Sequence, residues 1–123
     1  MKSLENFVVY RKAVELLGLS SKIIDLLPRG HATLVDQLRL SSLSIPLNIA
    51  EGVGKMSLRD RQRFFSIARG SAFETYAILD ACKVMDLVEL SMLAHGQSLL
   101  TEIVAILTSL TGQAYQFKSK YKL

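Results

Sequence analysis

The chain has 123 residues, of which 50% are hydrophobic and 21% are charged, and its formal net charge is +4. This length predicts one domain, spanning residues 1–123, in which folding buries roughly two-thirds of the unfolded chain's surface. The start of the chain lacks the apolar core of a signal peptide, no apolar stretch has the character of a membrane span, and Cys82 has no partner for a disulfide. We therefore expect a cytoplasmic protein that neither crosses nor binds a membrane.

Helical spacing of apolar residues predicts four long helices, over residues 4–27, 33–53, 57–85 and 88–118. In the first helix the predicted buried stripe is Phe7, Tyr10, Val14, Leu17, Ser21 and Ile24; in the second it is Leu34, Leu38, Ser41, Ile45, Asn48 and Gly52. In the fourth it is Met92, Gly96, Leu99, Ile103, Ile106 and Leu110. The short connections predict an all-α, antiparallel up-and-down four-helix bundle.

The third and fourth helices carry more apolar surface than a monomeric bundle needs. The third shows two neighbouring apolar stripes, and the fourth has one formal charge, Glu102, between Leu90 and Phe117. One explanation is a wide core stripe within a monomer. The other, which we favour, is contact with further copies of the chain through these two helices.

Pro46 lies inside the second helix, where its missing N–H and its ring predict a kink. Asn48 and Glu51 follow within the next turns, Gly52 closes the helix, and Glu51 precedes Lys55 by four residues, the favourable order for an ion pair. These residues either shape the helix end and the following turn or bind a ligand.

Positive charge concentrates at the start of the third helix, where the Ser57 hydroxyl is expected to accept a hydrogen bond from the backbone of Asp60. Residues 55–69 carry a net charge of +4, equal to that of the whole chain, from Lys55, Arg59, Arg61, Arg63 and Arg69 against Asp60. Arginines in a first helical turn oppose the helix dipole, so local stability does not explain them. The segment is either a solvated face with local ion pairs or a site for a polyanion such as nucleic acid. Lys118, Lys120 and Lys122 add a second basic group.

The sequence predicts no catalytic residue, metal site or cofactor site. His31 and His95 are isolated, and no other ligand stands at metal-binding spacing. Ser71 lacks a base that could activate it, and we interpret Gly70 and Ser71 as small residues that let helices approach closely. An enzyme acting on a small phosphorylated substrate is the weakest of three hypotheses.

Several segments resemble the family of 23S rRNA intervening-sequence proteins, also called four-helix-bundle proteins. The resemblance rests on Phe7 with residues 9–13 (VYRKA), on residues 37–39 (QLR), on residues 44–52 (SIPLNIAEG) and on residues 63–74 (RFFSIARGSAFE). These motifs span nearly the whole chain. The family pattern often has a basic residue at position 40 and a basic or aromatic one at position 53, where Leu40 and Val53 stand here.

The resemblance implies a cytoplasmic bacterial protein with a left-handed bundle, a homopentameric assembly and no enzymatic activity. It also implies a link to rRNA. Our leading hypothesis is a non-enzymatic oligomeric module that binds a nucleic-acid backbone through Arg39, Lys55, Arg59, Arg61, Arg63 and Arg69, with Pro46, Asn48, Glu51 and Gly52 as the family motif. The alternative is a scaffold or accessory subunit that docks a polymerase or a ribosome-associated protein.

Overall fold

Helices make up the structure, a computed structural model that describes residues 2–112, with side chains from residue 4 onward. The elements are α1 (Lys2–Glu5), α2 (Val8–Leu26), α3 (Ala32–Gly54), α4 (Leu58–Val84) and α5 (Leu90–Thr111). Over this part of the chain there is no strand. The prediction of an all-helical chain with four long helices is confirmed.

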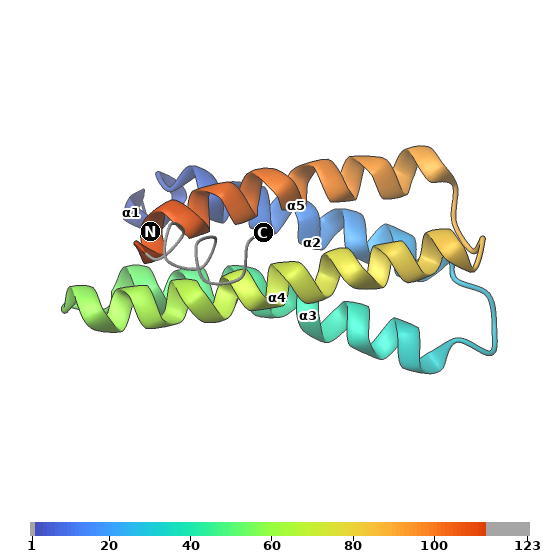
Figure 1. Ribbon diagram of the computed structural model, residues 1–123, viewed down its shortest axis with the longest axis horizontal. Helices are drawn as coiled ribbons and strands as arrows, with labels where there is room; N and C mark the ends of the chain where they lie inside the picture. Colours follow the sequence, from blue (N-terminus) through green and yellow to red (C-terminus); the bar gives the residue numbers. More distant parts are fainter. Residues whose placement is uncertain (1, 113–123) are drawn as a thin grey trace, which may run out of the picture.

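The four long helices lie side by side (Figure 1), and each contacts two others: α3 with α4, α4 with α5, α2 with α3, and α2 with α5. The core between them is formed almost wholly by Leu, Ile, Val and Ala side chains. At one end, called here the Lys55 end, the turn from α3 to α4 lies near the start of α2 and the end of α5. At the other, called the His31 end, lie the α2–α3 and α4–α5 connections.

The predicted first helix is wrong at its start. Phe7 adopts an extended conformation (φ −81°, ψ 116°) that separates α1 from α2, and Arg11 of α2 donates a hydrogen bond to the carbonyl oxygen of Glu5 at 2.5 Å. The buried stripe lies one residue away from the predicted one, although both follow helical spacing within the uninterrupted α2. The residues of α2 that are buried are Val9, Ala13, Leu16, Ser20 and Ile23, whereas Val14 and Ser21 are exposed.

The fourth predicted helix corresponds to α5, which begins within two residues of the predicted start and ends before the predicted end. α5 ends at Thr111 because Gly112 adopts the left-handed conformation (φ +69°) that commonly terminates a helix. Residues 113–118 of the predicted helix, and the three C-terminal lysines, lie outside the described residues. Gly96, Leu99 and Ile103 of the predicted seam are buried, and a second stripe of Leu93, Leu100 and Leu107 is buried beside them because α5 packs against both α2 and α4.

The second helix follows its prediction closely. α3 runs without interruption through the buried Pro46, and Leu38, Ser41, Ile45 and Gly52 of the predicted stripe are buried. The third is equally close, since α4 begins directly after Ser57. The kink at Pro46 remains a prediction.

Two glycines permit close approach between helices, although not the one expected from the sequence. A Cβ at Gly52 would lie 2.6 Å from Cε1 of Phe65 on α4, and one at Gly96 would lie 2.9 Å from Cδ1 of Leu79. Gly70 is exposed, and a Cβ added there would meet nothing within 4 Å, so the interpretation of Gly70 as a packing residue is wrong. Ser71 does lie at a helix contact, where its hydroxyl is 2.7 Å from that of Ser44.

By length and composition, α5 could also cross a membrane, with a mean hydropathy of 1.4 over its most apolar window. In the bundle, α5 packs against α2 and α4. Its one charged residue, Glu102, forms an ion pair with Lys12 of α2. A core helix of a soluble bundle passes the same composition test, so α5 is weak evidence for a membrane span.

Candidate nucleic-acid interface

The basic segment begins at the turn that joins α3 to α4. Lys55 is the C-terminal cap of α3 and adopts an extended conformation. Ser57 caps α4, and its hydroxyl accepts a hydrogen bond from the backbone N–H of Asp60 at 3.2 Å, as the sequence predicts. The turn therefore places Lys55 and the first arginines of α4 together at the Lys55 end.

Two of the basic residues help to hold this turn. The Nε of Arg61 donates to the carbonyl oxygen of Lys55 at 2.6 Å, which satisfies an acceptor at the end of α3. Lys55 Nζ lies 3.5 Å from Oε2 of Glu51, the ion pair that the i, i+4 spacing predicts. Because both partners of this pair are substantially exposed, its contribution to stability is small.

Phe64 lies between two of the cations. Lys55 Nζ is 5.2 Å and the guanidinium carbon of Arg63 is 4.7 Å from the centre of its ring. Cations at these distances are attracted by the ring quadrupole. Phe64 thus restricts where Lys55 and Arg63 present their charges.

Arg69 is engaged between α4 and α5. Its Nε donates to the hydroxyl of Thr108 at 2.7 Å, and its guanidinium carbon lies 4.8 Å from the centre of the Phe73 ring. This arginine joins two helices, a role that the sequence did not suggest.

Arg59 and Arg63 have exposed side chains. They lie one turn apart on α4, and neither forms an ion pair with any of the described residues. They border a shallow hollow together with Gln62, Ser66, Ile67 and Thr111. This pair is therefore the part of the basic segment best placed to meet an anion.

Arg39 does not join the basic segment. It is exposed on α3, sixteen residues before Lys55, a separation of about 24 Å along a helix. At its level α3 meets the middle of α4, where Ser41 bonds Thr75. Of the six residues predicted to bind nucleic acid, four thus lie at the Lys55 end, Arg69 lies about 9 Å beyond Arg63 along α4, and Arg39 is distant on α3.

The residues of the family motif make contacts within α3 and between α3 and α4. Asn48 Nδ2 donates to the carbonyl oxygen of Ser44 at 2.9 Å and to its hydroxyl at 3.0 Å, and the Ser44 hydroxyl in turn bonds Ser71. Gly52 accommodates the Phe65 ring, and Glu51 is exposed and paired with Lys55. Of the two roles left open by the sequence, these contacts support shaping of the α3–α4 contact.

Sequence reasoning missed a set of hydroxyl contacts between the two helices, called here the polar ladder, which links Ser41 and Ser44 of α3 to Thr75 and Ser71 of α4. The hydroxyl of Thr75 donates to Ser41 at 2.9 Å and to the carbonyl oxygen of Ser71 at 2.8 Å, one turn from the Ser44–Ser71 pair. The signal was present in the sequence, because Ser41, Ser44, Ser71 and Thr75 recur at helical spacing on facing helices.

In residues 2–112, no three His, Cys, Asp or Glu side chains lie close enough together to hold a metal ion. Cys82 is fully buried, and this burial raises the pKa of its thiol, so it is a poor nucleophile.

Comparison with known proteins agrees with this architecture. A family model for 23S rRNA-intervening sequence proteins matches residues 5–109. The chain belongs to this family. The intervening-sequence protein fold is also found in a crystal structure of a protein of unknown function from the S23 ribosomal protein family of Bacteroides thetaiotaomicron.

That structure superimposes with a TM-score of 0.78 at 24% sequence identity, covering 85% of this chain and 98% of its own. At this identity the likeness extends to the fold alone. No curated protein matches the chain. Neither the family name nor that of the similar structure specifies an enzymatic reaction, and the function of the family member from Bacteroides is unknown.

Proposed function

We propose that this intervening-sequence protein is a non-enzymatic, cytoplasmic, oligomeric module that binds the phosphate backbone of nucleic acid, with RNA linked to 23S rRNA intervening sequences as its natural ligand. The observation that carries the proposal is the exposed pair Arg59 and Arg63, which has no ion-pair partner within residues 4–112 and stands where the chain concentrates its positive charge. Guanidinium groups of this kind bind phosphate oxygens through charge-assisted hydrogen bonds.

The surface favours recognition of the backbone over recognition of bases. Single-stranded nucleic acids are usually read by rows of aromatic side chains on which bases stack. Within the basic segment Phe64 is half-buried, and its ring is in contact with the cationic groups of Lys55 and Arg63. Phe65 is buried in the core. Binding is therefore expected to depend on charge and to vary little with base sequence.

The proposal is tested by fluorescence anisotropy with a structured RNA over a range of salt concentrations. Affinity should fall steeply as salt rises, because each phosphate contact releases condensed counterions. A variant with Arg59, Arg61 and Arg63 all replaced by Ala should bind much more weakly, with a shallower salt dependence. A flat salt response, or no binding at low salt, would refute the proposal.

Oligomer formation is supported by apolar surface on two separate faces, one of which lies on α3 and not on the third and fourth predicted helices, where the sequence led us to expect the contact. Leu40, Leu43 and Leu47 form an exposed stripe on the outer side of α3, and Phe73 and Tyr76 of α4 are exposed beside α5. A closed ring needs two different surfaces that complement each other, one on each side of every subunit. Five subunits, as the family resemblance implies, would present five copies of the basic segment and strengthen weak contacts by multivalency.

The assembly has its own test in multi-angle light scattering at micromolar concentration. The expected mass is that of an oligomer, with five subunits as the specific expectation. A strict monomer under these conditions would contradict the oligomer and would leave nucleic-acid binding to be judged by the anisotropy experiment.

In the same proposal, the kink predicted at Pro46 orients the basic segment. Pro46 is buried, cannot donate to the carbonyl oxygen of Ser42, and precedes Lys55 by nine residues on the same helix. A bend at Pro46 sets the direction of the last turns of α3, and so the angle at which Lys55 and the arginines of α4 meet a ligand.

A further inference from the structure

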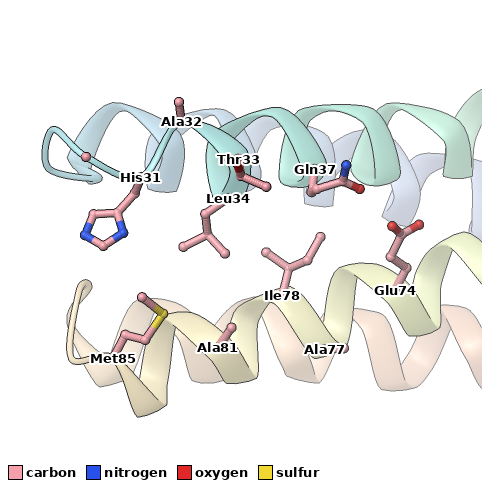
Figure 2. Close-up of a pocket in the computed structure, with 11 residues that line it drawn as sticks. His31, Ala32, Thr33, Leu34, Gln37, Glu74, Ala77, Ile78, Ala81 and Met85 are labelled. Atoms are coloured by element: carbon pink, nitrogen blue, oxygen red, sulfur yellow. The ribbon is translucent and has the colours of Figure 1, made fainter.

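A groove opens between α3 and α4 at the His31 end, far from the basic segment. The two helices touch at Ser44–Ser71 and Ser41–Thr75, and beyond that level a cavity of about 640 Å³ separates them. Figure 2 shows Leu34 of α3 facing Ile78 of α4 and Met85, the residue directly after α4, across this cavity.

The walls of the groove are largely apolar, with Gln37 and Glu74 at its inner end and His31 and Thr33 toward its outer end (Figure 2). Ala77 and Ala81 leave room between the helices, while Gln37 and Glu74 lie opposite each other near the Ser41–Thr75 contact (Figure 2). Glu74 forms no ion pair with any residue of the described chain. The groove therefore offers an apolar floor and one available carboxylate.

The surrounding charge is negative, in contrast to the Lys55 end. The connections and helix ends near the groove carry six acidic residues against four basic ones, namely Asp25, Asp36, Glu74, Asp80, Asp86 and Glu89 against Lys22, Arg29, Arg39 and Lys83. Such a field favours a cationic partner and repels nucleic acid. The groove is thus suited to a ligand different from the one proposed for the basic segment.

The dimensions favour a short helical segment. Glu74 of α4 and Met85, the C-terminal cap of this helix, are eleven residues apart, a length of about 16 Å, which corresponds to about three turns of helix. Amphipathic helices commonly bind such grooves through apolar residues spaced three or four apart. The small side chains of Ala77 and Ala81 would admit bulky residues of that kind.

We propose that this groove docks a basic amphipathic helix of a partner protein, with its apolar residues on Leu34, Ile78 and Met85 and a Lys or Arg paired with Glu74. This inference is independent of nucleic-acid binding, since it uses other residues at the other end of the bundle. The protein would then join a basic protein segment to a nucleic acid.

A displayed peptide library provides the test, with peptides of about a dozen residues selected on the full-length protein. The enriched sequences should place Lys or Arg three or four residues from Leu, Ile or Phe. Selection without that pattern, or no enrichment, would overturn the proposal.

Variants then locate the binding of a synthetic peptide made from the enriched sequence. Glu74→Gln should weaken it roughly tenfold through loss of a charge-assisted contact, and Ala81→Phe should weaken it further by filling the groove. The matched controls Glu15→Gln on α2 and Ala94→Phe on α5 change exposed positions outside the groove and should leave affinity within about twofold. Equal effects of controls and groove variants would contradict the site.

Light scattering separates a foreign partner from a second copy of the chain. Ala81→Phe should leave the mass of the assembly unchanged. A fall in mass would mean that a neighbouring subunit occupies the groove, which would also overturn the proposal.

Discussion

Among the described glycines, Gly52 is the one at which the fold leaves the least room for an added side chain. Replacing it by Ala would place a Cβ 2.6 Å and 2.8 Å from two ring atoms of Phe65 and 3.2 Å from the carbonyl oxygen of Arg61, so the buried Phe65 ring or the two helices must shift. We expect Gly52→Ala to lower the free energy of unfolding by about 1–3 kcal/mol, the usual cost of overpacking. Chemical denaturation measures it.

The control is Gly18→Ala, in the middle of α2, where nothing lies within 4 Å of the added Cβ. This change should stabilise the protein by about 0.5–1 kcal/mol, because Ala favours the helix over Gly. Equal stability of Gly52→Ala and wild type would show that the contact with Phe65 relaxes freely.

Cys82 gives a prediction about pH. Burial raises its pKa in the folded state, so the thiol loses its proton more readily in the unfolded chain. The contribution of the buried, protonated thiol to the free energy of unfolding is fully present below the ordinary thiol pKa of about 8.5. This contribution is lost as the pH rises through the higher pKa of the thiol in the folded protein. The free energy of unfolding should decline above about pH 8.5, and Cys82→Ala should flatten this decline; the same slope in both proteins would contradict the assignment.

At the residue scale the sequence predicted contacts that depend on neighbours in the chain and missed those between helices. The Ser57 cap and the Glu51–Lys55 pair follow from spacing within a few residues. The engagement of Arg69 with Thr108 joins residues 39 apart, and sequence spacing carries no information about such a pair.

At the element scale, the polar ladder between α3 and α4 fixes how these helices face each other. The Thr75 hydroxyl is buried and bonds Ser41, so each group satisfies the other away from water. A double-mutant cycle with Ser41→Ala and Thr75→Val should give a coupling energy of about 0.5–1.5 kcal/mol. Strict additivity of the two changes in denaturation would show that the ladder contributes nothing.

Helix boundaries were predictable wherever the chain carries its own stop or start signal. Ser57 and the glycines ending α3 marked those boundaries within one residue. The break at Phe7 was missed because it has no such signal and depends on Arg11 bonding the Glu5 carbonyl. The buried face of α2 was misplaced by one residue, a rotation of about 100°, because the small Ala13 and the polar Ser20 belong to the buried stripe.

For the whole molecule, the main feature is a separation of charge between the two ends of the bundle. The Lys55 end presents Arg59 and Arg63, and the His31 end carries an excess of acidic residues. The basic segment could be located from the sequence, whereas the acidic groove could not, because it is formed by residues from 30–37 and 74–85 that only the fold brings together. The two ends thus support different partners.

The most direct test compares two triple variants that remove the same charge from opposite ends. Arg59, Arg61 and Arg63 are replaced by Gln in one, and Lys22, Arg29 and Lys83 in the other, so each lowers the formal charge from +4 to about +1. Circular dichroism checks that both fold, and anisotropy measures binding to one structured RNA at fixed salt. We expect the first variant to lose at least about tenfold in affinity while the second stays within about threefold of wild type; equal losses in both would show that net charge alone, and not the basic segment, binds RNA.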